Sequence, residues 1–165
     1  MVARKHPLPQ AASTRANTDE ARDRINWNYH ERHDGKNAVI SEWRNTVQKK
    51  VRVKMDRSLD QLRQMPKVEW HKPAPASNIG DHIYVIRFTD QTGMQIRVFG
   101  HFHDPHKAFV MTFVGHEKDG KYVPANYQEL AQGHRAHCSD QFQKRTQPYG
   151  DRCAFCAAGD FPIRH

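Results

Sequence analysis

The spacing of apolar residues changes along the chain and predicts the order of its secondary structure. Residues 25–29 alternate between apolar and polar, as in a half-buried strand, and Asp34-Gly35 then predicts a turn. Over residues 38–65 the apolar positions recur every three or four residues, which is typical of an amphipathic helix. This segment is either one helix or a hairpin of two that bends near residues 46–50. Pro66 ends it, because proline cannot continue a helix.

The second half of the chain has mainly the two-residue period of strands. Residues 82–88 and 94–103 alternate, and residues 108–114 form a nearly continuous apolar run, so the three segments predict an antiparallel meander. Pro124 then opens a predicted helix that runs to about Cys138, since proline is tolerated in the first turn. The order of strand, basic helix, three strands and helix predicts an α+β fold.

Length and composition limit the class of protein. A chain of 165 residues suits one domain and excludes large multi-domain enzymes. No apolar run reaches the roughly 18 to 20 residues that span a bilayer, and the start lacks the apolar segment of a secretory signal. We therefore expect a cytoplasmic protein with no membrane partner. The expected division is an N-terminal tail over residues 1–24, which is flexible or partly helical, a domain over 25–137 and a cysteine-containing extension over 138–165.

Positive charge is concentrated in the first half of the chain. The whole sequence has 26 basic and 18 acidic residues, a formal net charge of +8, and residues 1–72 hold 16 of the basic and 9 of the acidic ones. Such an excess favours a polyanionic partner, nucleic acid first. The polar faces of the amphipathic segment are either solvated surface or contacts to phosphate, and the candidate nucleic-acid-binding residues there are Lys49, Lys50, Arg52, Lys54 and Arg57.

Several short phrases, in this order, are similar to those of a known family. Ile-Ser-Glu-Trp opens the basic segment at residues 40–43. The first two meander strands contain Ile-Tyr-Val-Ile-Arg at residues 83–87 and Gln-Ile-Arg-Val-Phe at residues 95–99. The apolar third strand, at residues 109–113, and a helix that begins with proline, at residues 124–135, complete the set. Over residues 25–137 the chain resembles the RelE/HigB superfamily of toxin–antitoxin ribonucleases, including phage-derived relatives. The resemblance implies a small twisted antiparallel sheet packed against basic N-terminal helices. It also implies a toxin that binds the ribosome, cleaves mRNA in the decoding site and is neutralised by a cognate antitoxin.

Cleavage of RNA by its own 2′-hydroxyl needs a general base, cations for the phosphoryl oxygens and an acid for the leaving oxygen, and it needs no metal. Arg87 and Arg97 fall at the family's arginine motifs, and a guanidinium can clamp two phosphate oxygens. Either arginine is alternatively an ordinary ion-pair partner on the sheet.

The chain departs from the family after the third strand. Where many relatives have Phe-x-Lys-Lys, it has Phe-Val-Gly-His, so that His116 replaces a lysine. Histidine titrates near neutrality and suits general acid–base catalysis, although His116 is alternatively a surface turn residue. Lys118 and Lys121 can supply cationic groups, and Tyr122 can stack on a base or act as a weak acid.

Two further histidines, His101 and His103, alternate with Arg97 along the second meander strand. They share its face unless a bulge intervenes at Gly100. Either one can replace His116 as the acid–base group, or contact nucleic acid, or simply lie at a sheet edge.

The C-terminal region carries a possible structural zinc site. Cys153 and Cys156 have zinc-knuckle spacing, and His134 and Cys138 stand four residues apart on the predicted helix, so the four make a candidate tetrahedral set. His137 is a competing ligand. The alternatives are a Cys153–Cys156 redox pair or free thiols.

Three functions are consistent with these features. The first is a RelE/HigB-like endoribonuclease toxin that acts on mRNA at the ribosome. The second is a non-catalytic module with the same fold that binds nucleic acid or protein, which the missing Lys-Lys favours. The third is a zinc-stabilised DNA-binding protein.

Overall fold

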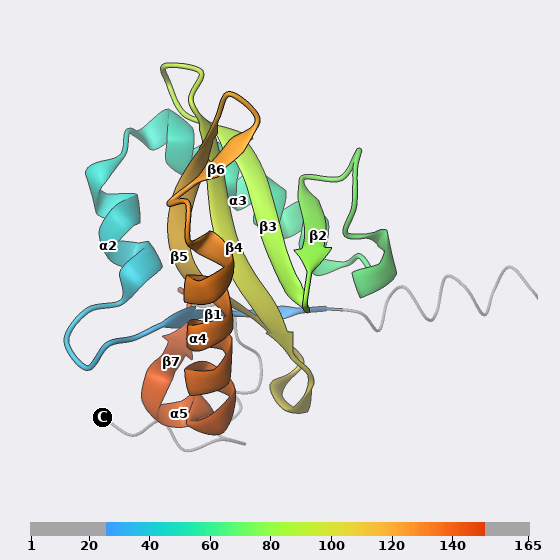
Figure 1. Cartoon of the computed structure of the whole chain (residues 1–165), viewed down its shortest axis with the longest axis vertical. Helices are drawn as coiled ribbons and strands as arrows, with labels where there is room; N and C mark the ends of the chain where they lie inside the picture. Colours follow the sequence, from blue (N-terminus) through green and yellow to red (C-terminus); the bar gives the residue numbers. More distant parts are fainter. Residues whose placement is uncertain (1–25, 151–165) are drawn as a thin grey trace, which may run out of the picture.

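The computed structural model of the chain describes residues 26–150 and has the predicted α+β architecture (Figure 1). Within these residues one mixed sheet has helices on both faces. Its strands are β1 Asn28–Arg32, β2 Ala76–Gly80, β3 Ile83–Thr89, β4 Gln95–His103, β5 Ala108–Lys118, β6 Lys121–Val123 and β7 Thr146–Pro148. The helices are α2 Val39–Thr46, α3 Lys49–Arg63, α4 Tyr127–Asp140 and α5 Phe142–Arg145, with 3₁₀ turns η1 Lys67–Glu69 and η2 Asp104–His106.

The strand order is β2-β3-β4-β5-β1-β7, and β6 forms a hairpin with β5. The predicted antiparallel meander is β3-β4-β5. The sheet as a whole is mixed, because β1 runs parallel to β5 and antiparallel to β7. The chain leaves β1, passes through both basic helices and the meander, and returns with β5 alongside β1. This parallel pair is where the sheet differs from the fully antiparallel one that we expected.

The basic amphipathic segment is a pair of helices, which decides between the two alternatives. The first helix, α2, ends at Thr46. Val47, which follows it, and Gln48, which precedes α3, both adopt an extended backbone conformation. Both helices bury apolar residues against one face of the sheet, the α2/α3 face, in a core with Tyr29, Trp70 and Phe109. The predicted 3.6-residue period is therefore the period of this buried face.

Helix α4 crosses the opposite face of the sheet, the α4 face, as Figure 1 shows. It covers a smaller core in which Ala131 packs near Ile83, Val85, Phe99 and Phe113. The rings of Phe99 and Phe113 are stacked with their centroids 4.4 Å apart. The helix begins at Tyr127 and ends at Asp140, within three residues of the prediction.

A bulge in β5 sets which side chains reach each face. Phe99 pairs with Phe113 whereas Gly100 pairs with Met111, so Thr112 is the extra residue. Gly100 is required at this point, because a Cβ atom there would lie 2.3 Å from the carbonyl oxygen of Val110. Because the extra residue is in β5, the alternation along β4 is uninterrupted.

Three short strands were not expected from the sequence. The first is β2, which forms in a proline-rich connection and pairs with β3. The second is β6, which pairs with β5, and the third is β7, which pairs with β1. The sheet thus extends beyond the predicted boundary at residue 137. The predicted tail over residues 1–24 lies outside the described residues. Among residues 26–150 none of the helices is long and apolar enough to cross a membrane.

Candidate functional site

The two motif arginines lie side by side on the α4 face. Arg87 on β3 and Arg97 on β4 are direct cross-strand partners. By the alternation of side chains along a strand, Arg87 is on the same face as Ile83 and Val85, and Arg97 is on the same face as Phe99. These three apolar residues belong to the core beneath α4. Both arginines therefore share one face of the sheet, and Arg87 is on the side of Ile83 and Val85.

Arg97 is buried, and each of its three guanidinium nitrogens donates a hydrogen bond. Its Nε and Nη2 donate to Glu117 Oε2 at 2.9 and 2.5 Å, Nη2 also donates to Gln95 Oε1 at 2.6 Å, and Nη1 donates to the carbonyl of Ile96 at 2.9 Å. Gly115 is the β5 partner of Arg97 and Glu117 is two residues further along β5, so the arginine reaches Glu117 diagonally. Arg97 holds this carboxylate in place.

Arg87 is half-buried and has only neutral partners among the described residues. Its Nη2 donates to the carbonyl oxygens of Ala74 and Ala76, the latter at 3.2 Å, and its buried Nε has no hydrogen-bond acceptor. Burial and, next, the charge of Arg97 lower the pKa of Arg87. Two like charges on directly opposed strand positions repel each other, so the pair needs more negative charge than Glu117 supplies.

Tyr122 completes the group of polar side chains on this face. It pairs with Glu117 across the β5-β6 hairpin, and its ring lies 5.7 Å from that of Phe99 and 4.9 Å from that of Tyr127. Burial and the nearby Glu117 carboxylate raise the pKa of the Tyr122 phenol, so the hydroxyl stays protonated at neutral pH. We call Arg87, Arg97, Glu117 and Tyr122 the arginine cluster.

His116 does not belong to the arginine cluster. It pairs with Ile96 and stands one residue from Gly115 and Glu117, so its side chain is on the opposite, α2/α3 face with Ile96 and Val114. There it is half-buried and lines a shallow pocket beside the β3-β4 turn. The candidate acid–base group His116 and the candidate phosphate ligand Arg97 therefore lie on different faces of the sheet, because consecutive strand residues point to opposite faces.

His101 and His103 do share the face of Arg97, since β4 has no bulge of its own. His101, however, is 1% exposed and lies near His134 and Arg135 of α4, which excludes the predicted contact with nucleic acid. Burial is the main reason that the pKa of His101 is lowered to about 3. His103 is half-buried and stacks on Phe142, with ring centroids 4.1 Å apart.

The predicted cationic residues lie outside the arginine cluster, some on the hairpin beside it and the others across the sheet. Lys118 and Lys121 are exposed at the tip of the β5-β6 hairpin. The cations of α3 are on the other side of the sheet, where Lys54 donates to Thr89 Oγ1 at 2.8 Å and so reaches the end of β3. Of these α3 residues, Arg52 is half-exposed and the others are exposed: Lys49, Lys50, Lys54 and Arg57.

The predicted zinc ligands are only partly within the described residues. His134 and Cys138 line one pocket beside α4, together with His137. Cys153 and Cys156 lie outside the described residues. Among residues 26–150 no three metal-ligating side chains gather into a group that could hold an ion. The four-ligand zinc site stays a prediction.

Sequence reasoning missed Glu117. The signal was available, because Glu117 lies two residues beyond the cross-strand partner of Arg97 and diagonal pairs of long side chains can meet across antiparallel strands. Finding it required the register of β4 against β5, which depends on the bulge at Thr112.

Comparisons with models of known protein families, with curated proteins and with solved structures found no match for this chain. The resemblance to the RelE/HigB superfamily stays a prediction.

Proposed function

We propose that the chain is a RelE/HigB-like endoribonuclease that cleaves mRNA at the arginine cluster. The observation that carries the proposal is the charge of this cluster: Arg87 and Arg97 are direct cross-strand partners, and the carboxylate of Glu117 balances only one of them. A phosphodiester is a suitable second counter-charge, since arginine binds phosphate oxygens in a bidentate manner.

The roles follow from the contacts of each side chain. Glu117 uses Oε2 to hold Arg97, so Oε1 is the atom that accepts the 2′-hydroxyl proton. The 2′-oxygen then bonds to phosphorus as the bond to the 5′-oxygen breaks. Arg87 stabilises the charge on the phosphoryl oxygens, and the protonated Tyr122 donates to the leaving oxygen. The products are a 2′,3′-cyclic phosphate and a 5′-hydroxyl. Arg97 is a positioning residue in this scheme rather than a catalytic one.

The lysines near the cluster supply sequence-independent affinity for RNA. Lys118 and Lys121 stand on the hairpin that carries Glu117 and Tyr122, and Lys54 lies at the end of the strand that carries Arg87. Cations at these positions fit a phosphate backbone that runs along the end of the sheet. A ribosome-bound mRNA as substrate and a cognate antitoxin as partner are part of the proposal on the basis of the family resemblance.

The test is controlled expression in a bacterial host, with growth and transcript ends as readouts. The wild-type chain should arrest growth and cut mRNA only while the mRNA is translated. Tyr122→Phe and Arg87→Gln should lower cleavage by about 100-fold or more, because each removes one group from the transition state. Arg57→Gln, a loss of one exposed cation on α3, should retain cleavage. Intact transcripts under wild-type expression would refute the proposal.

A second candidate is the non-catalytic binding module, and the burial of Arg97 favours it. Each nitrogen of this guanidinium donates a hydrogen bond within the protein, and the exposed cations of α3 can bind nucleic acid on the other side of the sheet. The module predicts salt-dependent RNA binding that Arg57→Gln weakens, with no cleavage by any variant. The expression experiment therefore separates the two functions.

A further inference from the structure

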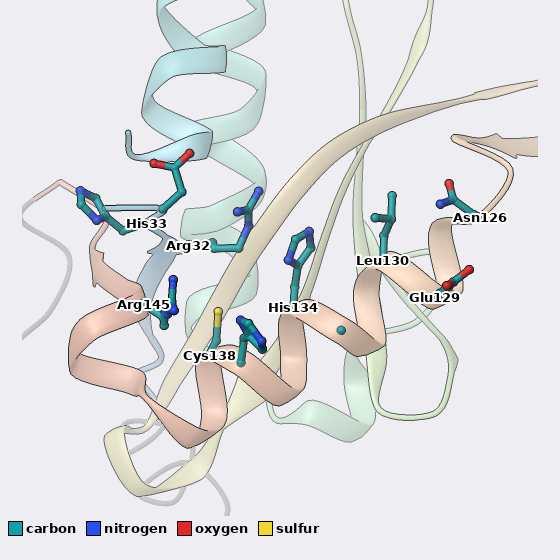
Figure 2. A pocket seen from close by; sticks show the side chains of 11 residues that line it. Arg32, His33, Asn126, Glu129, Leu130, His134, Cys138 and Arg145 are labelled. Carbon is teal, nitrogen blue, oxygen red and sulfur yellow. The ribbon is translucent and has the colours of Figure 1, made fainter. Parts of the chain in front are cut away.

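A pocket of about 470 Å³ lies beside α4, away from the arginine cluster (Figure 2). One wall is the helix, which contributes Leu130, Gly133, His134 and Cys138. The other wall comes from the end of β1 and the loop that follows it, and from Arg145 at the end of α5. A volume of this size is within the usual range for small-molecule sites.

Arginine side chains gather at one end of this pocket. Figure 2 shows Arg32, His134, Cys138 and Arg145 around that end. Arg32 Nε donates to the carbonyl oxygen of Thr112 at 2.9 Å, a contact that fixes the guanidinium at the pocket wall. Both arginines are half-buried, and neither is in an ion pair among the described residues. Partly buried cations of this kind need a counter-charge.

Among the described residues, the two carboxylates that line the pocket provide little of it: Asp34 interacts with Arg32 and His33, but less than with the backbone N–H groups of its own turn, and it is exposed to solvent. Asp34 Oδ1 accepts the backbone N–H groups of Lys36 and Asn37 at 3.1 and 2.8 Å, so it is held in its own turn. Glu129 is exposed and stands at the far end, close to Asn126 in Figure 2. The end that holds the arginines is therefore electropositive.

Histidines at this end add ring N–H donors. His33 Nδ1 accepts the backbone N–H of Gly35 at 3.1 Å, which leaves the ring proton on Nε2. His134 lines the same end of the pocket from α4, where its ring N–H can donate one hydrogen bond. The donors come from separate segments of the chain, which suits a tetrahedral oxyanion with three free oxygens better than a planar carboxylate.

A cation is a poorer fit here, although His134 and Cys138 are two of the predicted zinc ligands. Zinc binds the thiolate of cysteine. Arg32 and Arg145 lie at the same end of the pocket as Cys138. The same two arginines repel a metal ion at this position.

We propose that this pocket binds a phosphate monoester, with Arg32 and Arg145 as the principal ligands of the phosphate group. His33 and His134 donate to the remaining oxygens, and Leu130 offers apolar surface to the esterified group. The site shares no residue with the arginine cluster, so loss of RNA cleavage and loss of monoester binding are separate outcomes.

Calorimetric titration of the full chain tests the proposal with four probes: inorganic phosphate, adenosine 5′-monophosphate, a phosphoserine peptide and acetate. Arg145→Gln keeps the backbone carbonyl that accepts the N–H of His33, and should weaken monoester binding by at least about tenfold. Lys144→Gln is the matched control, because it removes the same charge from the neighbouring residue of α5 and should bind like the wild type. Arg145→Lys should restore part of the affinity, which shows that the charge rather than the fold was lost.

The two monoester arms distinguish the source of the phosphate, since the tighter of them identifies either a nucleotide or a phosphorylated protein. Failure of both to bind at millimolar concentration would overturn the proposal. So would an equal loss in Lys144→Gln, or acetate binding as tightly as the monoesters. Stoichiometric zinc binding that requires His134 and Cys138, with no binding of either monoester, would replace the anion site by the metal site.

Discussion

The ion pair between Arg97 and Glu117 makes a quantitative prediction for Glu117→Gln. The side chain of Arg97 is 8% exposed and that of Glu117 is 26% exposed, so the variant leaves a buried guanidinium without its counter-charge. Removing one partner of a fully buried pair costs about 3 to 5 kcal/mol. Glu117 is partly solvated, Gln95 remains as an acceptor and the new amide keeps one oxygen, so we reduce the expected loss of folding free energy to about 2 kcal/mol.

The pair between Arg44 and Asp56 is the matched control. It is also an arginine–carboxylate pair with two hydrogen bonds, here from Nη1 and Nη2 to Oδ1 and Oδ2 at 2.6 and 2.8 Å, but its side chains are 28% and 27% exposed. Water can solvate what remains after Asp56→Asn, so we expect a loss of no more than about 1 kcal/mol.

Urea denaturation followed by circular dichroism measures both variants. With a slope of about 2 kcal/mol per molar urea, Glu117→Gln should lower the midpoint by about 1 M and Asp56→Asn by half of that or less. Equal midpoints for Glu117→Gln and the wild type would show that the pair does not balance a buried charge. A larger loss for Asp56→Asn would refute the argument from burial.

Three further predictions concern the packing and titration of the core. Gly100→Ala should destabilise the fold by at least about 2 kcal/mol in the same urea assay, because the new Cβ would meet the Val110 carbonyl oxygen at 2.3 Å; unchanged stability would contradict the bulge geometry. Burial lowers the pKa of both His30 and His101 to about 3. Below pH 6.5 the unfolded chain therefore binds protons that the folded protein does not, and for each histidine the free energy of unfolding falls by about 1.4 kcal/mol per pH unit from pH 6.5 towards 3. A thermal midpoint that is flat over this range would contradict the burial of both rings. Cys138, whose thiol pKa is about 11, should stay unmodified by a thiol reagent at pH 8 in the native protein and react in urea, as peptide mass spectrometry would show.

Periodicity predicted the main elements because each of them has one buried face. The 3.6-residue pattern of residues 38–65 follows the contact of α2 and α3 with the sheet, and the alternation of the meander follows its two cores. The pattern does not show whether the segment is one helix or two, because two helices that bury the same face continue the same period across Val47 and Gln48. The parallel pairing of β1 with β5 has no local signal, because it joins segments about 80 residues apart.

The arginine cluster was predictable in part. Alternation along single strands placed Arg87 with Val85 and Arg97 with Phe99. The position of His116 depended on counting along β5, where one residue decides the face, and the register that brings Glu117 to Arg97 depends on the extra residue Thr112. The burial of His101 required knowledge of where α4 crosses the sheet, which strand periodicity does not contain.

The chemical form of the RNA fragment ends tests the central proposal most directly. Ribosomes would first be assembled on an mRNA, and the free magnesium would then be replaced by calcium or spermidine. The purified chain would be added to these ribosome–mRNA complexes, and the 3′ ends of the mRNA fragments would be identified by mass spectrometry. Attack by the 2′-hydroxyl at the arginine cluster predicts 2′,3′-cyclic phosphate ends that disappear with Tyr122→Phe and with a 2′-deoxy substitution at the cleaved position. Uncut mRNA, or fragments that form equally from the 2′-deoxy substrate, would contradict it.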